Sequence, residues 1–193
     1  MARDLRRHSR IMCALIANLQ LGACTSQIDA ISPSFETVQV LREKAVPSLA
    51  LGKFIPVSRD IGRSVAIRMS VMHAPKGQNF AEFLGASFET ELKAAGKLNP
   101  SSPLRLQGVL TESHASEDLA RGGASLAATI TLTQSGKTVF SKPYRVETRW
   151  RSDFIGAIAI PEAFRQYNSL YALLVRQVLS DPGLITAAKQ TPP

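Results

Sequence analysis

The residues of this chain that could take part in catalysis are few and scattered. Histidine is the commonest general base, and the sequence contains only His8, His73 and His114. His73 falls in a predicted loop and His114 at a polar strand end, and neither has a neighbouring partner that would position its ring. The motifs G-x-S-x-G, H-E-x-x-H and G-x-x-x-x-G-K-[ST] do not occur. The sequence therefore predicts a protein that is not an enzyme.

Three acidic residues are the strongest candidates for a cation site. Glu112, Glu117 and Asp118 lie within seven positions of one another. Their spacing lacks the alternating ligands and the central glycine of a calcium loop. We therefore expect a solvated turn at this place, and we predict no metal and no cofactor.

The N-terminal segment has the composition of an export signal. Residues 1–10 carry four arginines against one aspartate, and residues 11–24 are mostly apolar. The apolar run is too short to cross a bilayer as a stable helix. A basic start, a short apolar run and small residues before a cleavage site are typical of a secretory signal. We predict that residues 1–23 are a lipoprotein signal peptide.

The end of this segment resembles the lipobox of bacterial lipoproteins. Leu21, Gly22 and Ala23 precede Cys24, and in the lipobox the cysteine thiol receives diacylglycerol and becomes the new N-terminus. Each buried methylene adds about 0.8 kcal/mol, so three acyl chains would hold the protein firmly on a membrane. By the same resemblance, a residue other than Asp after the cysteine, here Thr25, favours the periplasmic face of the outer membrane. The periplasmic face of the inner membrane is the alternative.

Composition argues against two further classes of protein. The only other cysteine, Cys13, would leave with the signal peptide, so the mature chain has no cysteine for a disulfide or a metal site. The net charge is +8, of which the signal peptide accounts for three, and the remaining basic residues are spread along the chain. Nucleic-acid-binding proteins concentrate such residues on one face or helix. We predict no nucleic-acid partner, whereas a mildly basic surface suits anionic lipid headgroups.

The mature chain reads as a single domain behind a short linker. Residues 24–47 show no sustained period and are predicted to be a tether, with an edge strand at about 35–40. Residues 48–193 are predicted to be one α/β domain. Alternating apolar residues predict strands in this domain at residues 49–56, 65–69, 103–110, 126–133 and 138–150. A hairpin at 134–137 is predicted to join the last two.

Apolar residues at helical spacing predict two helices. The first begins after Asn79, a good N-terminal cap, and ends before Gly96. The second is predicted to begin at Pro161, because proline favours the first helical position, and it ends near residue 180. The order of elements predicts an α+β fold, a mostly antiparallel sheet of about five strands with two helices packed on one face.

The segment 150–160 joins a strand to a helix and is unusually apolar for a connection. Phe154, Ile158 and Ile160 could fill the end of the core under the helix, which is the interpretation that the pattern favours. Alternatively, the segment is an exposed loop that docks a lipid or a protein partner. The candidate docking residues are then Trp150, Arg151, Phe154 and Ile155.

Three stretches carry a family resemblance: FAEFLGASFETELKAAG, LRLQGVLTES and RWRSDFIGAIAIPEAFRQYNSLYALLVRQVLSDPGL. Together they resemble small Gram-negative envelope lipoproteins of the YajG type and the auxiliary lipoproteins of ABC-type lipid transport systems. The resemblance covers about residues 49–184 and rests on the order of elements. It implies two helices packed on one side of a mostly antiparallel sheet.

The resemblance and the lipobox together predict the function. We expect a non-enzymatic, lipid-anchored periplasmic lipoprotein that binds or scaffolds an envelope protein or a lipid. The resemblance implies an auxiliary role in lipid transport. The alternative is an envelope regulator or assembly factor that contacts cell-wall or outer-membrane machinery.

Overall fold

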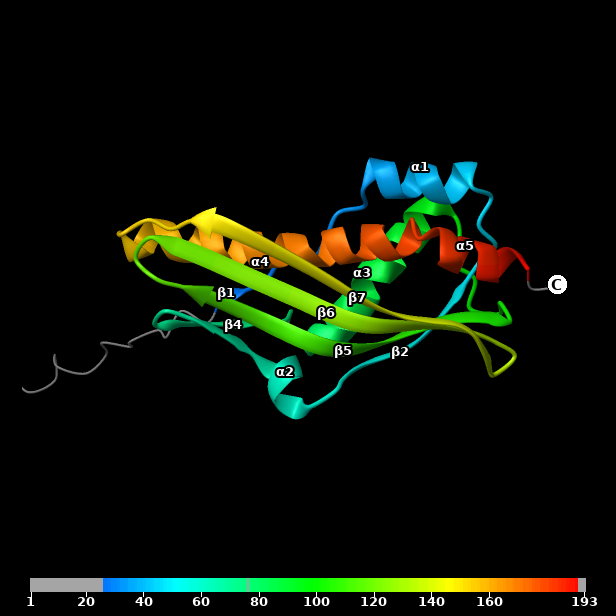
Figure 1. Cartoon of the computed structure of the whole chain (residues 1–193), viewed down its shortest axis with the longest axis horizontal. Helices are drawn as coiled ribbons and strands as arrows, with labels where there is room; N and C mark the ends of the chain where they lie inside the picture. Colours follow the sequence, from blue (N-terminus) through cyan, green and yellow to red (C-terminus); the bar gives the residue numbers. More distant parts are fainter. Residues whose placement is uncertain (1–25, 76, 191–193) are drawn as a thin grey trace, which may run out of the picture.

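A four-stranded mixed sheet forms the centre of the fold (Figure 1). The computed structural model describes residues 26–75 and 77–190, so the predicted signal peptide, the lipobox and Cys24 lie outside the described residues. The strand order is β2-β5-β6-β7, and β2 runs parallel to β5 whereas the other neighbours are antiparallel. The strands are β2 (Ala50–Pro56), β5 (Leu104–Glu117), β6 (Arg121–Gln134) and β7 (Lys137–Arg151).

A second, smaller sheet consists of three short strands in the order β1-β4-β3. These strands are β1 (Ser26–Gln27), β3 (Val65–Ile67) and β4 (Ser70–His73), and both β3 and the short helix α2 (Arg59–Arg63) contact β5. The predicted α+β class is confirmed, but the strands are divided between two sheets. The strand predicted at 65–69 ends at Ile67, because Arg68 takes a φ of 51° and the chain turns back as β4.

Helices α3 (Phe80–Ala95) and α4 (Gly156–Leu179) pack on each other and on one face of the larger sheet (Figure 1). The bounds predicted for α3 are confirmed. The Asn79 side chain accepts the N–H groups of Ala81 and Glu82, while Glu82 accepts the N–H of Asn79, a complete capping box. Gly96 ends the helix in the left-handed region at a φ of 70°.

Aromatic side chains connect the two helices in the core. Phe83 lies edge-on to Tyr171, with ring centroids 4.7 Å apart, and Phe80 lies edge-on to Tyr167. The Tyr167 hydroxyl lies 2.6 Å from Ser113 Oγ on β5, and burial raises the pKa of Tyr167 to about 12. The alternation predicted for the strands at 103–110 and 126–133 is confirmed, since their inward residues are fully buried, among them Leu106, Leu110, Leu126, Ala128, Ile130 and Leu132. In the strands at 49–56 and 138–150 the prediction is partly wrong, because Ile55 and Val139 are exposed and Phe54 is buried instead.

The stretch predicted to be a tether is packed on the domain from residue 28 onward. A helix, α1 (Phe35–Glu43), replaces the edge strand predicted at 35–40. Thr37 and Leu41 are buried four positions apart, the spacing of a helix face, and the Ser34 hydroxyl caps the helix by accepting the N–H of Thr37. Glu91 on α3 accepts the N–H of Ser34 at 2.8 Å. Residues 28–47 are therefore part of the folded unit.

The last helix, α5 (Pro182–Lys189), is held by one carboxylate. Asp181 accepts the N–H groups of Gly183 and Leu184, and its other oxygen accepts hydrogen bonds from Lys142 Nζ (2.7 Å) and Tyr144 Oη (2.9 Å). Burial acts to raise the pKa of Asp181, but these donors together outweigh it and hold the pKa below its ordinary value. Asp181 therefore ties α5 to β7.

Candidate functional site

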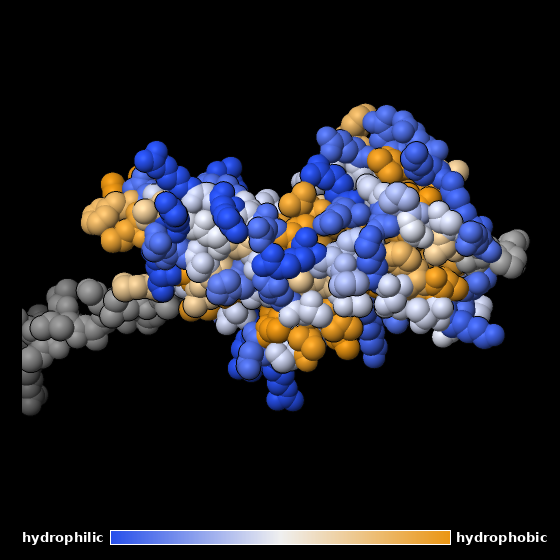
Figure 2. Space-filling view, viewed as in Figure 1, coloured by the Kyte–Doolittle hydropathy of each residue, from blue (hydrophilic) through white to orange (hydrophobic). Residues whose placement is uncertain are grey.

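Five large apolar side chains are exposed together at one end of the domain. Four of them lie on three connections that meet there, namely the β3–β4 turn, the β5–β6 turn and the segment leading into α4, and the fifth lies on the first turn of α4 itself. Each is 55–99% exposed, and they are half of the ten large apolar side chains exposed in the described residues. We name this set the apolar tip: Met69, Leu119, Phe154, Ile155 and Ile158. Figure 2 shows apolar surface gathered at the end of the molecule where α4 begins.

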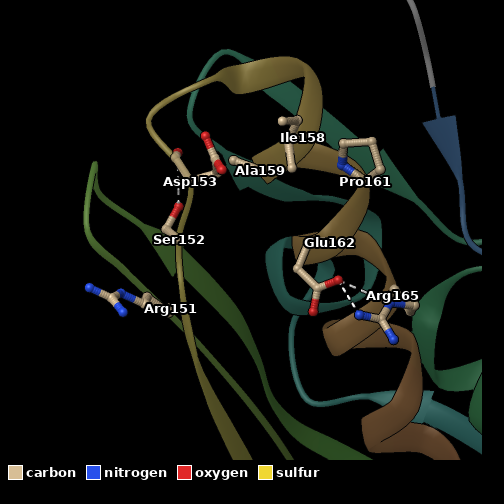
Figure 3. A pocket seen from close by; sticks show the side chains of 8 residues that line it. All are labelled: Arg151, Ser152, Asp153, Ile158, Ala159, Pro161, Glu162 and Arg165. Carbon is tan, nitrogen blue, oxygen red and sulfur yellow. Dashed lines mark hydrogen bonds and ion pairs between the residues drawn. The ribbon is translucent and has the colours of Figure 1, made fainter.

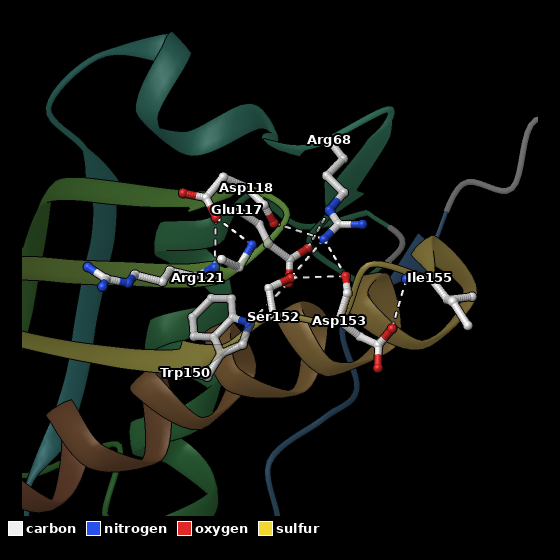
Figure 4. A network of polar contacts seen from close by, with 9 residues as sticks. Arg68, Glu117, Asp118, Arg121, Trp150, Ser152, Asp153 and Ile155 are labelled. Carbon is white, nitrogen blue, oxygen red and sulfur yellow. Dashed lines mark hydrogen bonds and ion pairs between the residues drawn. The ribbon is translucent and has the colours of Figure 1, made fainter.

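A single arginine joins the three connections (Figure 4). Arg68, in the β3–β4 turn, places Nη2 2.8 Å from the carbonyl oxygen of Asp118, 2.7 Å from Ser152 Oγ and 2.7 Å from the carbonyl oxygen of Asp153. Its Nε lies 3.3 Å from a carboxylate oxygen of Glu117. These acceptors come from both other connections, so the Arg68 side chain fixes how the tip residues sit relative to one another.

Glu117 is the buried centre of this network. Its side chain is 0% exposed, and its second oxygen accepts hydrogen bonds from Trp150 Nε1 (3.1 Å) and Ser152 Oγ (2.8 Å). The Trp150 ring packs against Gly122, where an added Cβ would overlap the indole. A buried carboxylate needs both an ionic partner and hydrogen bonds, and Glu117 has both.

The candidate docking residues are therefore divided in two. Trp150 is half-buried and bonded to Glu117, so it supports the tip, while Phe154 and Ile155 are exposed and form part of it. Arg151 is exposed on the last residue of β7. The expectation that Phe154 and Ile158 fill the end of the core is wrong, since both side chains face outward.

Helix α4 begins five residues earlier than Pro161, where the sequence predicted its start. The Asp153 carboxylate accepts the N–H of Ile155 at 2.8 Å, and the carbonyl oxygen of Ile155 accepts the N–H groups of Ile158 and Ala159. Proline in this early turn removes one intrahelical hydrogen bond. The extra turn before Pro161 is what carries Ile158 out to the surface.

An open pocket of about 520 Å³ lies between the segment before α4 and the first turns of that helix (Figure 3). Arg151 and Arg165 line it together with Asp153 and Glu162. The hydrogen bonds that Arg165 and Gln166 donate lower the pKa of Glu162, which disfavours it as a proton donor. Neither His73 nor His114 is among the residues lining this pocket.

The three acids singled out in the sequence have separate roles, and the expected solvated turn is wrong for Glu117, which is buried. Glu112 binds Arg145 and Ser125, and these hydrogen bonds lower its pKa. Asp118 accepts the N–H groups of Ala120 and Arg121, which closes the β5–β6 turn and lowers the pKa of Asp118. Within the described ranges, no three metal-ligating side chains come together.

The fold and this end of the domain define an α+β domain with a rigid, projecting apolar tip. No protein-family model and no curated protein matches the chain by sequence. Its fold is similar to the crystal structure of a Xanthomonas campestris protein of the DUF330 family. The TM-score is 0.57 at 15% sequence identity, over 87% of this chain and 98% of that chain.

Two weaker similarities are to crystal structures described as lipoproteins. One is a putative lipoprotein from Caulobacter crescentus, with a TM-score of 0.43 at 15% identity over 56% of this chain and 82% of that one. The other is a minor lipoprotein from Acinetobacter baumannii, with a TM-score of 0.39 at 12% identity over 70% of this chain and 94% of that one. Among residues 26–75 and 77–190, no helix is both long and apolar enough to cross a membrane.

Proposed function

We propose that the protein is a non-enzymatic lipoprotein of the Gram-negative envelope, held on the periplasmic face of a membrane through acylated Cys24. In this role it binds or scaffolds a partner, and the auxiliary role in ABC-type lipid transport is the one that we favour. Two observations support the proposal. The lipobox residues precede Cys24, and the DUF330 fold similarity extends over most of the chain, as the sequence resemblance to auxiliary lipoproteins implies.

The observation that carries most weight is the short distance from the proposed anchor to the fold. Cys24 lies two residues before β1, which begins at Ser26, and residues 28–47 are packed on the domain. Two extended residues span at most about 7 Å. A domain tied so closely would work at the membrane surface, which favours a surface-bound transport component over a protein that reaches across the periplasm.

The anchor is tested by replacing each cysteine in turn. We expect Cys24→Ala to abolish metabolic labelling with a palmitate analogue and to leave the uncleaved precursor, because the thiol that receives the lipid is gone. Cys13→Ala is the matched control, since it removes the other cysteine from within the signal peptide. Persistent labelling of the Cys24→Ala protein would refute the assignment.

The membrane is tested at the residue after the cysteine. If Thr25 allows transfer to the outer membrane, Thr25→Asp should move the acylated protein to the inner-membrane fraction of a sucrose gradient, while Thr25→Ser should leave it in place. A native protein that already sediments with the inner-membrane fraction would establish the inner-membrane alternative, and an Asp variant that stays in the outer-membrane fraction would refute the role given to Thr25.

The partner is tested by crosslinking in intact envelopes, followed by affinity purification of the full chain. We expect subunits of a lipid-transport ATPase and permease system to be recovered. Recovery of cell-wall synthases or outer-membrane assembly proteins would favour the regulator alternative instead. Recovery of no partner would count against a scaffold role.

A further inference from the structure

We propose that the apolar tip inserts into the interface of the bilayer that holds the lipid anchor, so that the domain has a second attachment and a fixed orientation on the membrane. This inference rests on the proposed acylation of Cys24. The occupant to which we commit is the lipid surface itself. The tip residues are the parts of the protein that enter the lipid surface. The contacts of Arg68 with Glu117, Asp118, Ser152 and Asp153, which we call the Arg68 network, hold these residues in place.

The direction of β1 places the anchor and the tip at the same end. Strand β4 starts at Ser70, directly after the turn that holds Met69, and runs away from the tip. Because β1 is parallel to β4, the chain enters β1 from the tip side. Ser26 lies opposite Met72, three residues from Met69, which is about 10 Å along a strand.

The length of chain between the anchor and the fold then fixes the height of the membrane. An acylated Cys24 has its sulfur at the interface, and at most about 7 Å of chain separates it from Ser26. The bilayer surface must therefore lie close to the end of the molecule at which β1 starts, where Figure 2 shows one of the patches of exposed apolar atoms. Interfacial protein segments bury apolar side chains about 5–10 Å into the headgroup and acyl boundary, a depth that side chains on projecting loops can reach.

The charges around the tip fit the same occupant. Arg121 and Arg151 are directly opposite each other on β6 and β7, both are exposed, and within the described residues neither forms an ion pair. The two acids beside the tip are bound to backbone N–H groups, Asp118 in the β5–β6 turn and Asp153 at the start of α4. The two arginines therefore give the edge of the tip exposed cations that anionic headgroups attract, while the carboxylates of Asp118 and Asp153 are directed to backbone N–H groups of the protein itself.

The support beneath the tip is rigid, which suits insertion without prior folding. Arg68 links the three connections through backbone acceptors 50 and 85 positions away along the chain. In Figure 4 the Ile155 side chain points away from this network, toward the outside of the domain. The apolar residues are thus presented outward at no further cost in chain ordering.

The experiment uses the full chain, processed and acylated in a Gram-negative host and reconstituted into phosphatidylethanolamine–phosphatidylglycerol vesicles. Cysteines are introduced one at a time by Leu119→Cys, Phe154→Cys and Ser101→Cys and are labelled with a nitroxide. Ser101 is an exposed control beyond the opposite end of the 14-residue strand β5. An acylated Cys24 has no free thiol, so it takes up no label.

We expect the labels at 119 and 154 to collide several-fold more often with lipid-soluble oxygen than with a water-soluble nickel chelate, and the label at 101 to show the reverse. Phe154→Ser with Ile158→Ser should return the label at 119 to water, while acylation and the circular dichroism spectrum stay unchanged. Phe35→Ser is the matched control, because this side chain is 81% exposed and lies far from the tip. The adjacent Glu36 bonds to Arg176, which is about 30 Å along α4 from the tip.

The outcomes separate the two proposals. Labels at 119 and 154 that stay in water on an acylated, vesicle-bound chain would overturn the tip proposal and leave the anchor standing. The tip proposal is also overturned, and the anchor again stands, if these labels are shielded from the nickel chelate in native envelopes but not on vesicles, since the tip then contacts a protein. Label uptake at Cys24, with no vesicle binding, would overturn the proposed function and the tip proposal together.

Discussion

Replacing Arg68 by methionine removes the cation that joins the three connections of the tip and keeps most of its apolar length. The arginine side chain is 14% exposed, and its partner Glu117 is fully buried. Glu117 keeps its hydrogen bonds from Trp150 and Ser152 in the variant. It loses its only ion-pair partner in the described part of the chain, so a carboxylate charge is left without a counter-charge in a buried place.

The structure sets the size of the expected effect. Removing one member of a buried ion pair typically costs 3–5 kcal/mol, because the remaining charge is uncompensated. The carbonyl oxygens of Asp118 and Asp153 add little, since they lie on exposed turns where water can replace Arg68. We therefore expect Arg68→Met to lower the free energy of unfolding by about 3–5 kcal/mol at neutral pH.

The assay is equilibrium denaturation of the purified chain, with a double-mutant cycle to find the cause. Glu117→Gln removes the buried charge but can keep the hydrogen bonds, so Arg68→Met should cost only about 1–2 kcal/mol in that background. Arg149→Met is the control, since this side chain is 84% exposed and should change stability by less than about 0.5 kcal/mol. A loss below about 1 kcal/mol for Arg68→Met, or equal losses in both backgrounds, would refute the reasoning.

Three further predictions concern a core ring on α3, the packing of Trp150 and the far end of the sheet. Phe88→Ala should destabilise the fold by about 3–5 kcal/mol, because this ring is fully buried on α3; urea denaturation that gives less than about 1 kcal/mol would contradict the burial. Gly122→Ala should displace Trp150, the only tryptophan, and shift its fluorescence to the red, whereas Gly123→Ala, whose Cβ would meet only the Thr148 carbonyl oxygen at an ordinary 3.8 Å, should leave the emission unchanged. Asp181 has a lowered pKa in the fold, so its stabilisation is present above its ordinary value of 3.8 and is lost as the pH falls through the folded value. The difference in unfolding free energy between the native chain and Asp181→Asn should therefore be about 1–2 kcal/mol near neutral pH and should shrink below pH ~4; a constant difference would contradict the linkage.

Local signals predicted the elements that depend on local chemistry. The bounds of α3 follow from Asn79 and Gly96, since a side-chain cap and a left-handed glycine act within one helical turn. The inward faces of β5 and β6 follow from the alternation of their larger apolar residues, because a strand buried on one face has a period of two. The hairpin at 134–137 likewise needs only its own turn residues.

The elements that depend on distant partners were not predictable in this way. Helix α1 buries only Thr37 and Leu41, and it is positioned by the contact of Ser34 with Glu91, 57 positions away. Strand β1 has two residues, too few to show any period, and exists through its pairing with β4. Pro161 misled the prediction of where α4 begins, because a preference for the first helical position does not exclude proline from a later turn.

The tip shows why a surface built from separate turns is difficult to predict from the sequence alone. Phe154 and Ile155 stand out as an apolar run, but Met69 and Leu119 are isolated residues in separate turns, and nothing local relates them. What relates them is the Arg68 side chain, whose acceptors lie 50, 84 and 85 positions away. Burying an ion pair costs desolvation energy, so such a pair adds little net stability compared with apolar packing of the same volume. We infer that these contacts fix the relative placement of the exposed apolar residues, and for this reason the stability of the Arg68 contacts and the membrane contact of the tip should be lost together.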